Sequence, residues 1–146
     1  MDWINIEKLR KYSAQESYKN QFYIRVERLI EYLQESTLIN NILEEEHLFY
    51  PKYLWQEDND LELYFFTKEH IVLCSLDSNQ KLFIIKRFTR DISKIEITNY
   101  DANHRDIQLI ITFVNKDEII LQSNDTNEHW KFKYFKKIQE LYNFIN

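Results

Sequence analysis

The sequence of 146 residues contains no glycine, whereas an average chain of this length would carry roughly ten, at a usage of about 7%. Several ligand-binding and catalytic turns depend on glycine, because the backbone must approach a ligand closely or adopt a positive φ. The P-loop, the dinucleotide-binding turn of Rossmann folds and the nucleophile elbow are therefore excluded in their usual forms. Turns that need a positive φ must instead use Asn or Asp, of which the chain has 13 and 9.

Proline, cysteine and long apolar runs are also scarce. Pro51 and Cys74 are single in the sequence, and a lone cysteine cannot form an internal disulfide. The longest apolar run, residues 109–114, contains Thr112 and is far shorter than the roughly 18 residues of a membrane-spanning helix. The first residues, Met1-Asp2-Trp3, lack the basic and apolar regions of a signal peptide. We therefore expect a cytoplasmic protein.

The net charge of −5 is confined to one part of the chain. Residues 1–60 hold 7 Lys and Arg against 12 Asp and Glu, whereas residues 61–146 hold 12 of each. Binding to a nucleic-acid backbone needs a basic surface. The acidic first part therefore argues against a nucleic-acid partner.

Apolar residues make up 44% of the chain and aromatic residues 16%, which is enough to form a folded core. A chain of this length suits one domain, which we expect to span residues 1–146. The hydrophobic pattern predicts helices over residues 1–47, antiparallel strands over 48–125 and a C-terminal helix over 126–146. The expected fold class is α+β.

The N-terminal part shows the period of amphipathic helices. Ser13 and Glu16 have the spacing of a capping box, and apolar residues then recur every three or four positions, which predicts a helix over about residues 14–35. A shorter helix is expected before it, and another over about residues 38–46. The first of these places three apolar side chains on one face: Trp3, Ile6 and Leu9.

From residue 48 the hydrophobic period changes to two, which is typical of strands. Short polar turns separate seven such stretches, so seven antiparallel strands are predicted. They cover residues 49–55, 61–65, 70–76, 81–90, 92–100, 106–114 and 118–123. Because the turns at residues 77–79, 101–103 and 115–117 contain Asn and Asp, we expect a positive φ at some of these positions.

The C-terminal part returns to a helical period. Thr126 or Asp125 is a suitable N-cap for this helix. Residues 130–134 also alternate as a strand would, so a helix limited to residues 135–145 is the alternative. One apolar stripe is expected to face the core: Trp130, Tyr134, Ile138, Leu141 and Ile145.

Seven short antiparallel strands followed by one amphipathic helix resemble the pleckstrin-homology (PH) superfold. Residues 66–73, Phe-Thr-Lys-Glu-His-Ile-Val-Leu, are similar to the second hairpin of bacterial PH and GRAM-like domains. Residues 90–97, Arg-Asp-Ile-Ser-Lys-Ile-Glu-Ile, are similar to their Asp-Ile-x-x-Ile-Glu strand entry, and Trp130 resembles the tryptophan of the closing helix. Over residues 48–146 the resemblance implies a PH-like barrel or roll closed by the C-terminal helix, with the N-terminal helices packed on it.

The sequence departs from PH domains that hold phosphoinositides. Those domains use clustered Lys and Arg in the first hairpin, but residues 56–60 read Gln-Glu-Asp-Asn-Asp, which would repel a phosphorylated headgroup. His70 stands where the family usually has a basic residue. The whole chain also resembles small uncharacterised proteins of low-GC Gram-positive bacteria, and that resemblance implies no known activity.

Aromatic side chains are the main candidates for recognition, because tyrosine and tryptophan combine apolar area with a polar tip. Seven tyrosines cannot all be central in one small core: Tyr12, Tyr23, Tyr32, Tyr50, Tyr53, Tyr64 and Tyr100. We interpret the densest stretch, residues 49–55, as a strand that seals the helices onto the barrel, with an exposed binding edge as the alternative. The candidate partner-binding residues are Tyr50, Tyr53, Trp55, Lys131 and Lys133.

Lysines of the C-terminal helix would also suit an anionic membrane surface, although a solvated helix face is the favoured interpretation. These residues are Lys131, Lys133, Lys136 and Lys137. The sequence thus gives membrane association little support.

Two polar groupings carry possible chemistry. Asp101, His104 and Asp106 lie in one predicted loop and could ligate a metal, but no further ligand is close in sequence, so a polar hairpin tip is favoured. Cys74 and His70 share one face of a predicted strand, yet a cysteine between apolar residues more often belongs to the core. We therefore predict no catalytic residue, no metal and no cofactor.

These observations favour a non-catalytic cytoplasmic module that binds a protein or peptide. A small acidic inhibitor or immunity-type protein that neutralises a basic partner is the alternative, because charge in residues 1–60 would speed encounter. A metal-dependent enzyme is a third, less favoured class, because it would need polar groups that converge in a pocket and the sequence offers no such group. An exposed aromatic edge would also allow a homodimer.

Overall fold

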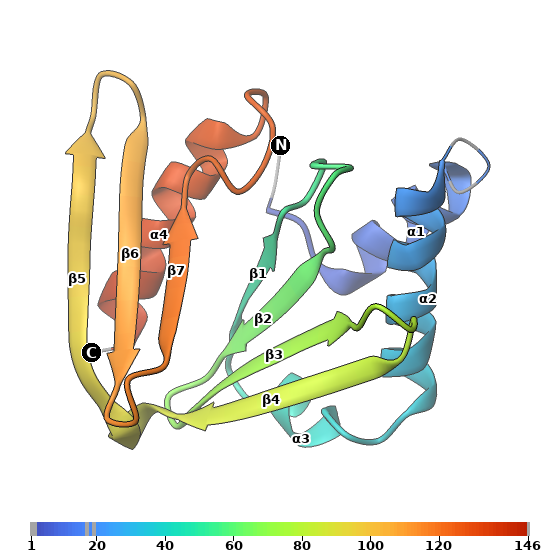
Figure 1. The fold of residues 1–146 in the computed structure, drawn as a ribbon, viewed down its shortest axis with the longest axis horizontal. Coiled ribbons are helices and arrows are strands. Elements are labelled where there is room, and N and C mark those ends of the chain that lie inside the picture. Colours follow the sequence, from blue (N-terminus) through green and yellow to red (C-terminus); the bar gives the residue numbers. More distant parts are fainter. Residues whose placement is uncertain (1–2, 17, 19, 146) are drawn as a thin grey trace.

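The computed structural model describes residues 3–16, 18 and 20–145. In this part of the chain, four helices accompany two antiparallel sheets (Figure 1). The helices are α1 (Ile6–Glu16), α2 (Gln21–Glu35), α3 (Asn40–Glu44) and α4 (Lys131–Phe144). The strands are β1 (Leu48–Lys52), β2 (Glu62–Phe66), β3 (His70–Leu76), β4 (Leu82–Phe88), β5 (Ile92–Asp101), β6 (Asp106–Phe113) and β7 (Glu118–Gln122). The predicted α+β class is confirmed.

Strands β1 to β4 form one sheet in chain order, and β5 to β7 form a second. In Figure 1 the second sheet stands upright on the left, while β3 and β4 run across the view on the right. Of the predicted seven-stranded barrel or roll, the barrel is wrong, because within the described residues backbone ladders join strands inside each sheet only. A single turn of 3-10 helix, Thr89–Asp91, bends the chain between β4 and β5.

Long side chains join β1 to β7 where a closed barrel would have a backbone ladder. The Tyr50 hydroxyl oxygen lies 3.2 Å from the Gln122 carbonyl oxygen, and Lys52 Nζ donates to the Ile120 carbonyl at 2.6 Å. These side chains lie between β1 and β7. Two strands paired by a backbone ladder would be about 4.8 Å apart and would leave no room for them. Side chains therefore bridge the seam between β1 and β7, which has no backbone ladder in the described residues and is open in that sense.

The N-terminal helices divide at a different place from the one predicted. Ser13 lies inside α1, where its buried hydroxyl donates to the Arg10 carbonyl at 3.1 Å, so the predicted capping box is wrong. Helix α2 begins at Gln21, and Asn20 Oδ1 caps it by accepting the Tyr23 amide at 3.3 Å. The apolar period runs through both helices, and a period alone does not locate the break.

Each sheet has a helix packed against it. Helix α2 packs against β3, and α4 lies against β6 and β7 (Figure 1). Strand β3 is buried at six of its seven positions, as expected for a strand covered on both faces. Strand β6 instead alternates between buried and half-buried residues, as predicted from its period of two.

Helix α4 begins at Lys131, so the alternative of a strand over residues 130–134 is wrong. Trp130 holds the N-cap position without a capping side chain, and Asn127 Oδ1 accepts its amide at 3.0 Å. Asp125 and Thr126 are buried upstream, so the predicted N-cap is wrong. Four members of the predicted stripe are buried: Tyr134, Ile138, Leu141 and Ile145.

The chain makes its turns without glycine in a way that the sequence predicts only in part. The described residues with positive φ are Tyr53, Trp55, Gln80, Asn99, Arg105 and Lys116. Of these, Lys116 (φ 76°) lies in a predicted turn, while Gln80 and Arg105 follow the other two. Asp77 and Asp101 instead accept backbone N–H groups two residues on, at 2.8 and 3.0 Å. Turn locations are thus confirmed, but Asn and Asp serve as acceptors there.

Candidate ligand-binding pocket

A pocket of about 650 Å³ opens between the N-terminal helices, the β1–β2 connection and the segment before α4. Sites for small ligands commonly measure about 300–1,000 Å³. Described residues that line it are Ile4, Lys8, Tyr12, Tyr23, Trp55, Glu57, Asn127, His129 and Trp130. Four of these nine are large aromatic residues, so the pocket is an aromatic one.

Trp55 is the aromatic residue that the others surround. Its ring centroid lies 4.3 Å from that of Tyr12, 6.5 Å from that of Tyr23 and 6.3 Å from that of Trp130. The ring planes are inclined to that of Trp55 by 70°, 51° and 45°, in the same order. The four rings therefore form inclined walls rather than a stack. We call them the aromatic cage.

Hydrogen bonds tie together the two loops that carry Trp55 and Trp130. The Tyr53 amide donates to the Asp125 carbonyl at 2.8 Å. The Gln56 side-chain amide donates to the Thr126 carbonyl at 2.9 Å. These two hydrogen bonds hold the loop of Trp55 beside the loop of Trp130.

Trp55 is held in an unfavourable conformation. Its φ is 68°, and that of nearby Tyr53 is 73°; positive φ at a bulky residue costs about 1–3 kcal/mol. Trp55 Nε1 is also buried without a hydrogen-bond partner in the described structure, a further cost of about 1–3 kcal/mol. The fold thus holds Trp55 in a costly conformation at the pocket that its side chain lines.

The described lining of the pocket contains one carboxylate and one lysine, Glu57 and Lys8. Glu57 Oε1 accepts the Asn20 side-chain amide at 3.1 Å. Burial, the neighbouring Tyr12 hydroxyl, and the carboxylates of Glu57 and Glu16 raise the pKa of Tyr23 to about 12. Anionic charge is therefore disfavoured near the Tyr23 hydroxyl. Lys8 adds a positive charge to the lining.

A buried polar network stands behind the loop that precedes Trp130. Asp125 Oδ2 accepts the Tyr50 hydroxyl at 2.8 Å and the Gln122 amide at 2.9 Å. Burial raises the pKa of Asp125 to about 6, although the charge of Lys52 and both hydrogen bonds oppose that rise. Perturbed carboxyls often mark functional sites, but Tyr50 and Asp125 are buried, at 0% and 1% exposure. This network supports the loops.

The structure separates the five predicted partner-binding residues. Trp55 lines the pocket, and Lys133 Nζ lies 4.7 Å from the centre of the Trp130 ring. The Lys52 ammonium lies 4.9 Å from the centre of the Tyr53 ring. The other two predicted residues, Tyr50 and Lys131, already have partners inside the protein. Tyr50 is fully buried and offers no surface to a partner. Lys131 donates to Asp106 at 2.7 Å.

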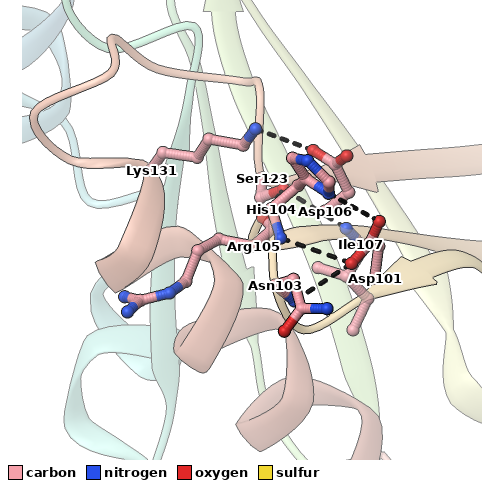
Figure 2. Close-up of polar contacts among 8 residues, drawn as sticks. All are labelled: Asp101, Asn103, His104, Arg105, Asp106, Ile107, Ser123 and Lys131. Carbon is pink, nitrogen blue, oxygen red and sulfur yellow. Dashed lines mark hydrogen bonds and ion pairs between the residues drawn. The ribbon is translucent and has the colours of Figure 1, made fainter.

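The β5–β6 hairpin tip does not bring the predicted metal ligands together. His104 Nδ1 lies 2.8 Å from Asp101 Oδ2, whereas Asp106 turns toward Lys131 at the start of α4 (Figure 2). Arg105 stacks on Phe132, 3.8 Å from its ring centre. No group of three or more His, Cys, Asp or Glu residues in the described part of the chain could hold a metal ion. The tip docks onto α4.

Cys74 and His70 lie on β3 as predicted. Cys74 is fully buried, and burial raises the pKa of its thiol to about 12. The thiol therefore stays protonated, and only the thiolate is a strong nucleophile. Cys74 belongs to the core.

The sequence did not single out most of the cage. Tyr12 and Tyr23 appeared only among tyrosines too numerous for one core, and Trp130 only as a helix residue. Their contact requires α1, α2 and two loops to meet, which no local pattern reveals. A usable signal was that all three tryptophans lie near the ends of predicted elements.

The chain belongs to a family of proteins of unknown function: the family model described as "Protein of unknown function (DUF3908)" matches residues 5–136. Comparison with curated proteins finds no match, and comparison with solved structures finds none either. In the residues that the structure describes, no helix is long and apolar enough to cross a membrane.

Proposed function

We propose that the protein is a non-catalytic cytoplasmic module that binds a protein or peptide through the aromatic cage. The observation that carries this proposal is the meeting of Tyr12, Tyr23, Trp55 and Trp130 around one pocket of about 650 Å³. Tyrosine and tryptophan give large contact areas while few rotatable bonds are frozen on binding. The strained backbone at Trp55 supports the same site, because residues with such backbone strain cluster at ligand clamps and active sites.

The PH-like resemblance is part of the proposal. It is supported by the order of elements: four strands in one sheet, three in the next, and then α4. In this interpretation the two sheets form a PH-like roll that is open along the seam between β1 and β7. The cage then lies between that roll and the added N-terminal helices. Fold analogy alone does not assign a ligand.

Selection from a random peptide display library tests the proposal. We expect the wild-type protein to enrich peptides with a common sequence pattern. Those peptides should lose about tenfold or more in affinity for Trp55→Leu, since a buried aromatic anchor contributes about 2 kcal/mol or more.

Phe83→Leu is the matched control, because Phe83 is an aromatic residue 37% exposed on β4, outside the pocket lining. Its affinity for the selected peptides should equal that of the wild type. Equal binding to wild type and Trp55→Leu, or no enrichment at all, would contradict the proposal. Circular dichroism of both variants establishes that they are folded.

A second candidate, an acidic inhibitor of a basic partner, is favoured by the surface of α2. Glu27, Glu31 and Glu35 follow one another at intervals of four, and the last two are exposed. Like charges at this spacing destabilise a helix by a few tenths of a kcal/mol, about 0.2–0.5 per pair. The inhibitor candidate would be supported if the protein binds an oligolysine peptide, and if its affinity falls steeply as the salt concentration rises and falls again in Glu31→Gln. Salt-independent binding would count against it.

A further inference from the structure

The walls of the aromatic cage face more than one direction. Three rings are tilted by 45° to 70° from the plane of Trp55. Tyr12 meets Trp55 edge to face at 4.3 Å, whereas the Tyr23 and Trp130 rings lie 6.5 and 6.3 Å from Trp55, so the four rings do not cover one another as a parallel stack would. The indole N–H of Trp55 has no hydrogen-bond partner in the described structure. The polar edge of the indole ring is thus buried.

Faces of tryptophan and tyrosine attract cations, because the π-system is negative above the ring plane. The chain already uses this interaction beside the cage. Lys133 Nζ lies 4.7 Å from the Trp130 ring centre, and Lys137 Nζ lies 5.1 Å from that of Trp3. Trp3 is the neighbour of Trp130, with 6.4 Å between the ring centres.

One end of the cage carries negative charge. Glu57 lies in the lining and is held by Asn20 at 3.1 Å. The carboxylates of Glu57 and Glu16 both act on the Tyr23 hydroxyl, whose pKa is raised to about 12 chiefly by burial. A cation in the pocket beside Tyr23 would be favoured by the same carboxylates. Lys8, also in the lining, opposes it.

The lining suits a weakly hydrated cation better than a primary ammonium. A primary ammonium has three donors and is strongly hydrated, so it must regain several acceptors when it leaves water. Glu57 is the one carboxylate among the lining residues described. A trimethylammonium group has no donor to satisfy and buries its methyl groups against aromatic faces.

We propose that the aromatic cage recognises a methylated ammonium group on a peptide, namely a trimethyllysine side chain. This inference rests on the proposed function and names the chemistry of its ligand. Trp55, Trp130, Tyr12 and Tyr23 line the pocket that receives the ammonium, and Glu57 contributes the opposite charge. The pocket of about 650 Å³ also holds part of the peptide around that side chain.

Isothermal calorimetry tests the inference with matched pairs of probes. One pair is a lysine peptide and the same peptide with trimethyllysine. The second is choline and its neutral isostere, in which a tert-butyl group replaces trimethylammonium. We expect the charged, methylated member of each pair to bind about tenfold more tightly, as cation–π attraction in a desolvated site predicts.

Two substitutions separate charge from shape. Glu57→Gln retains the oxygen that Asn20 Nδ2 contacts but removes the charge, so affinity for the trimethyllysine peptide should fall about threefold to tenfold. Asp58→Asn is the matched control, since Asp58 is an exposed neighbour outside the lining. Trp55→Phe should bind with intermediate strength, because tryptophan is the better cation acceptor. Lys8→Gln should strengthen binding.

The outcomes separate this inference from the proposed function. If the neutral isostere binds as well as choline, cation recognition is overturned while the pocket remains a binding site. If choline binds but the trimethyllysine peptide does not, the assignment to a peptide side chain is overturned. If no probe binds, the inference fails, and the peptide selection with Trp55→Leu then decides the proposed function by itself.

Discussion

The buried hydroxyl of Tyr50 donates a 2.8 Å hydrogen bond to Oδ2 of Asp125, which lies 75 positions later in the chain. The same oxygen accepts the Gln122 amide at 2.9 Å. This contact joins β1 to the segment between β7 and α4, and Trp55 and Trp130 follow these two segments. The Tyr50–Asp125 hydrogen bond therefore holds together the two segments that lead to Trp55 and Trp130.

Tyr50→Phe removes the hydroxyl and leaves Asp125 with one donor fewer. We expect the free energy of unfolding to fall by about 1–3 kcal/mol, because a buried charged acceptor loses a partner. Urea unfolding measures this change. Tyr100→Phe is the control, since Tyr100 is 55% exposed and should change stability by less than about 0.5 kcal/mol. Equal effects of the two substitutions would contradict the assigned role of the pair.

Asp125 makes the stability depend on pH in the direction opposite to that of an ion-paired carboxylate. Burial raises its pKa from 3.8 to about 6, so the folded protein binds the proton more tightly than the unfolded chain does. Its contribution is fully present below about pH 4 and is lost as the pH rises through about 6. A shift of about two pKa units corresponds to roughly 3 kcal/mol.

Asp125→Asn tests this linkage. An amide oxygen in place of Oδ2 can still accept from both Tyr50 and Gln122, but the group no longer titrates. We expect the unfolding free energy of the variant to fall less than that of the wild type between about pH 4 and about pH 6. Parallel curves for the two proteins over that range would show that Asp125 does not carry the effect.

Lys116→Gly should stabilise the protein. Lys116 has a φ of 76° in the turn before β7, and a side chain in this region of conformational space costs about 1 kcal/mol relative to glycine. We expect the melting temperature to rise. Lys94→Gly, an exposed position within β5, should lower it, because glycine weakens a strand. A fall for both variants would mean that the turn is unstrained.

The strands and α4 could be predicted from the sequence because each has its own period and is bounded by polar turns. The β6 strand and the α4 stripe of Tyr134, Ile138 and Leu141 show this directly. The break between α1 and α2 could not be predicted, because the apolar period passes through it. Ser13 and Glu16 have the spacing of a capping box, but both lie within α1.

The open seam and the pocket could not be predicted for a different reason. Closure of a barrel depends on whether β1 and β7 meet by backbone or by side chain, and Lys52 decides this by reaching the Ile120 carbonyl. The cage needs Tyr12, Tyr23 and Trp130 to reach Trp55 from three other segments. Both features depend on contacts between distant residues, which a local period does not contain.

The aromatic cage is tested most directly by the indole N–H resonances of the three tryptophans in an NMR correlation spectrum. A peptide enriched on the wild-type protein is added stepwise. The Trp55 resonance should shift most and that of Trp130 less, while that of Trp3, whose Nε1 donates to the Phe49 carbonyl at 2.7 Å, should stay near its place. An unchanged Trp55 resonance, with shifts confined to the amides of β4 or of the acidic face of α2, would contradict binding at the cage.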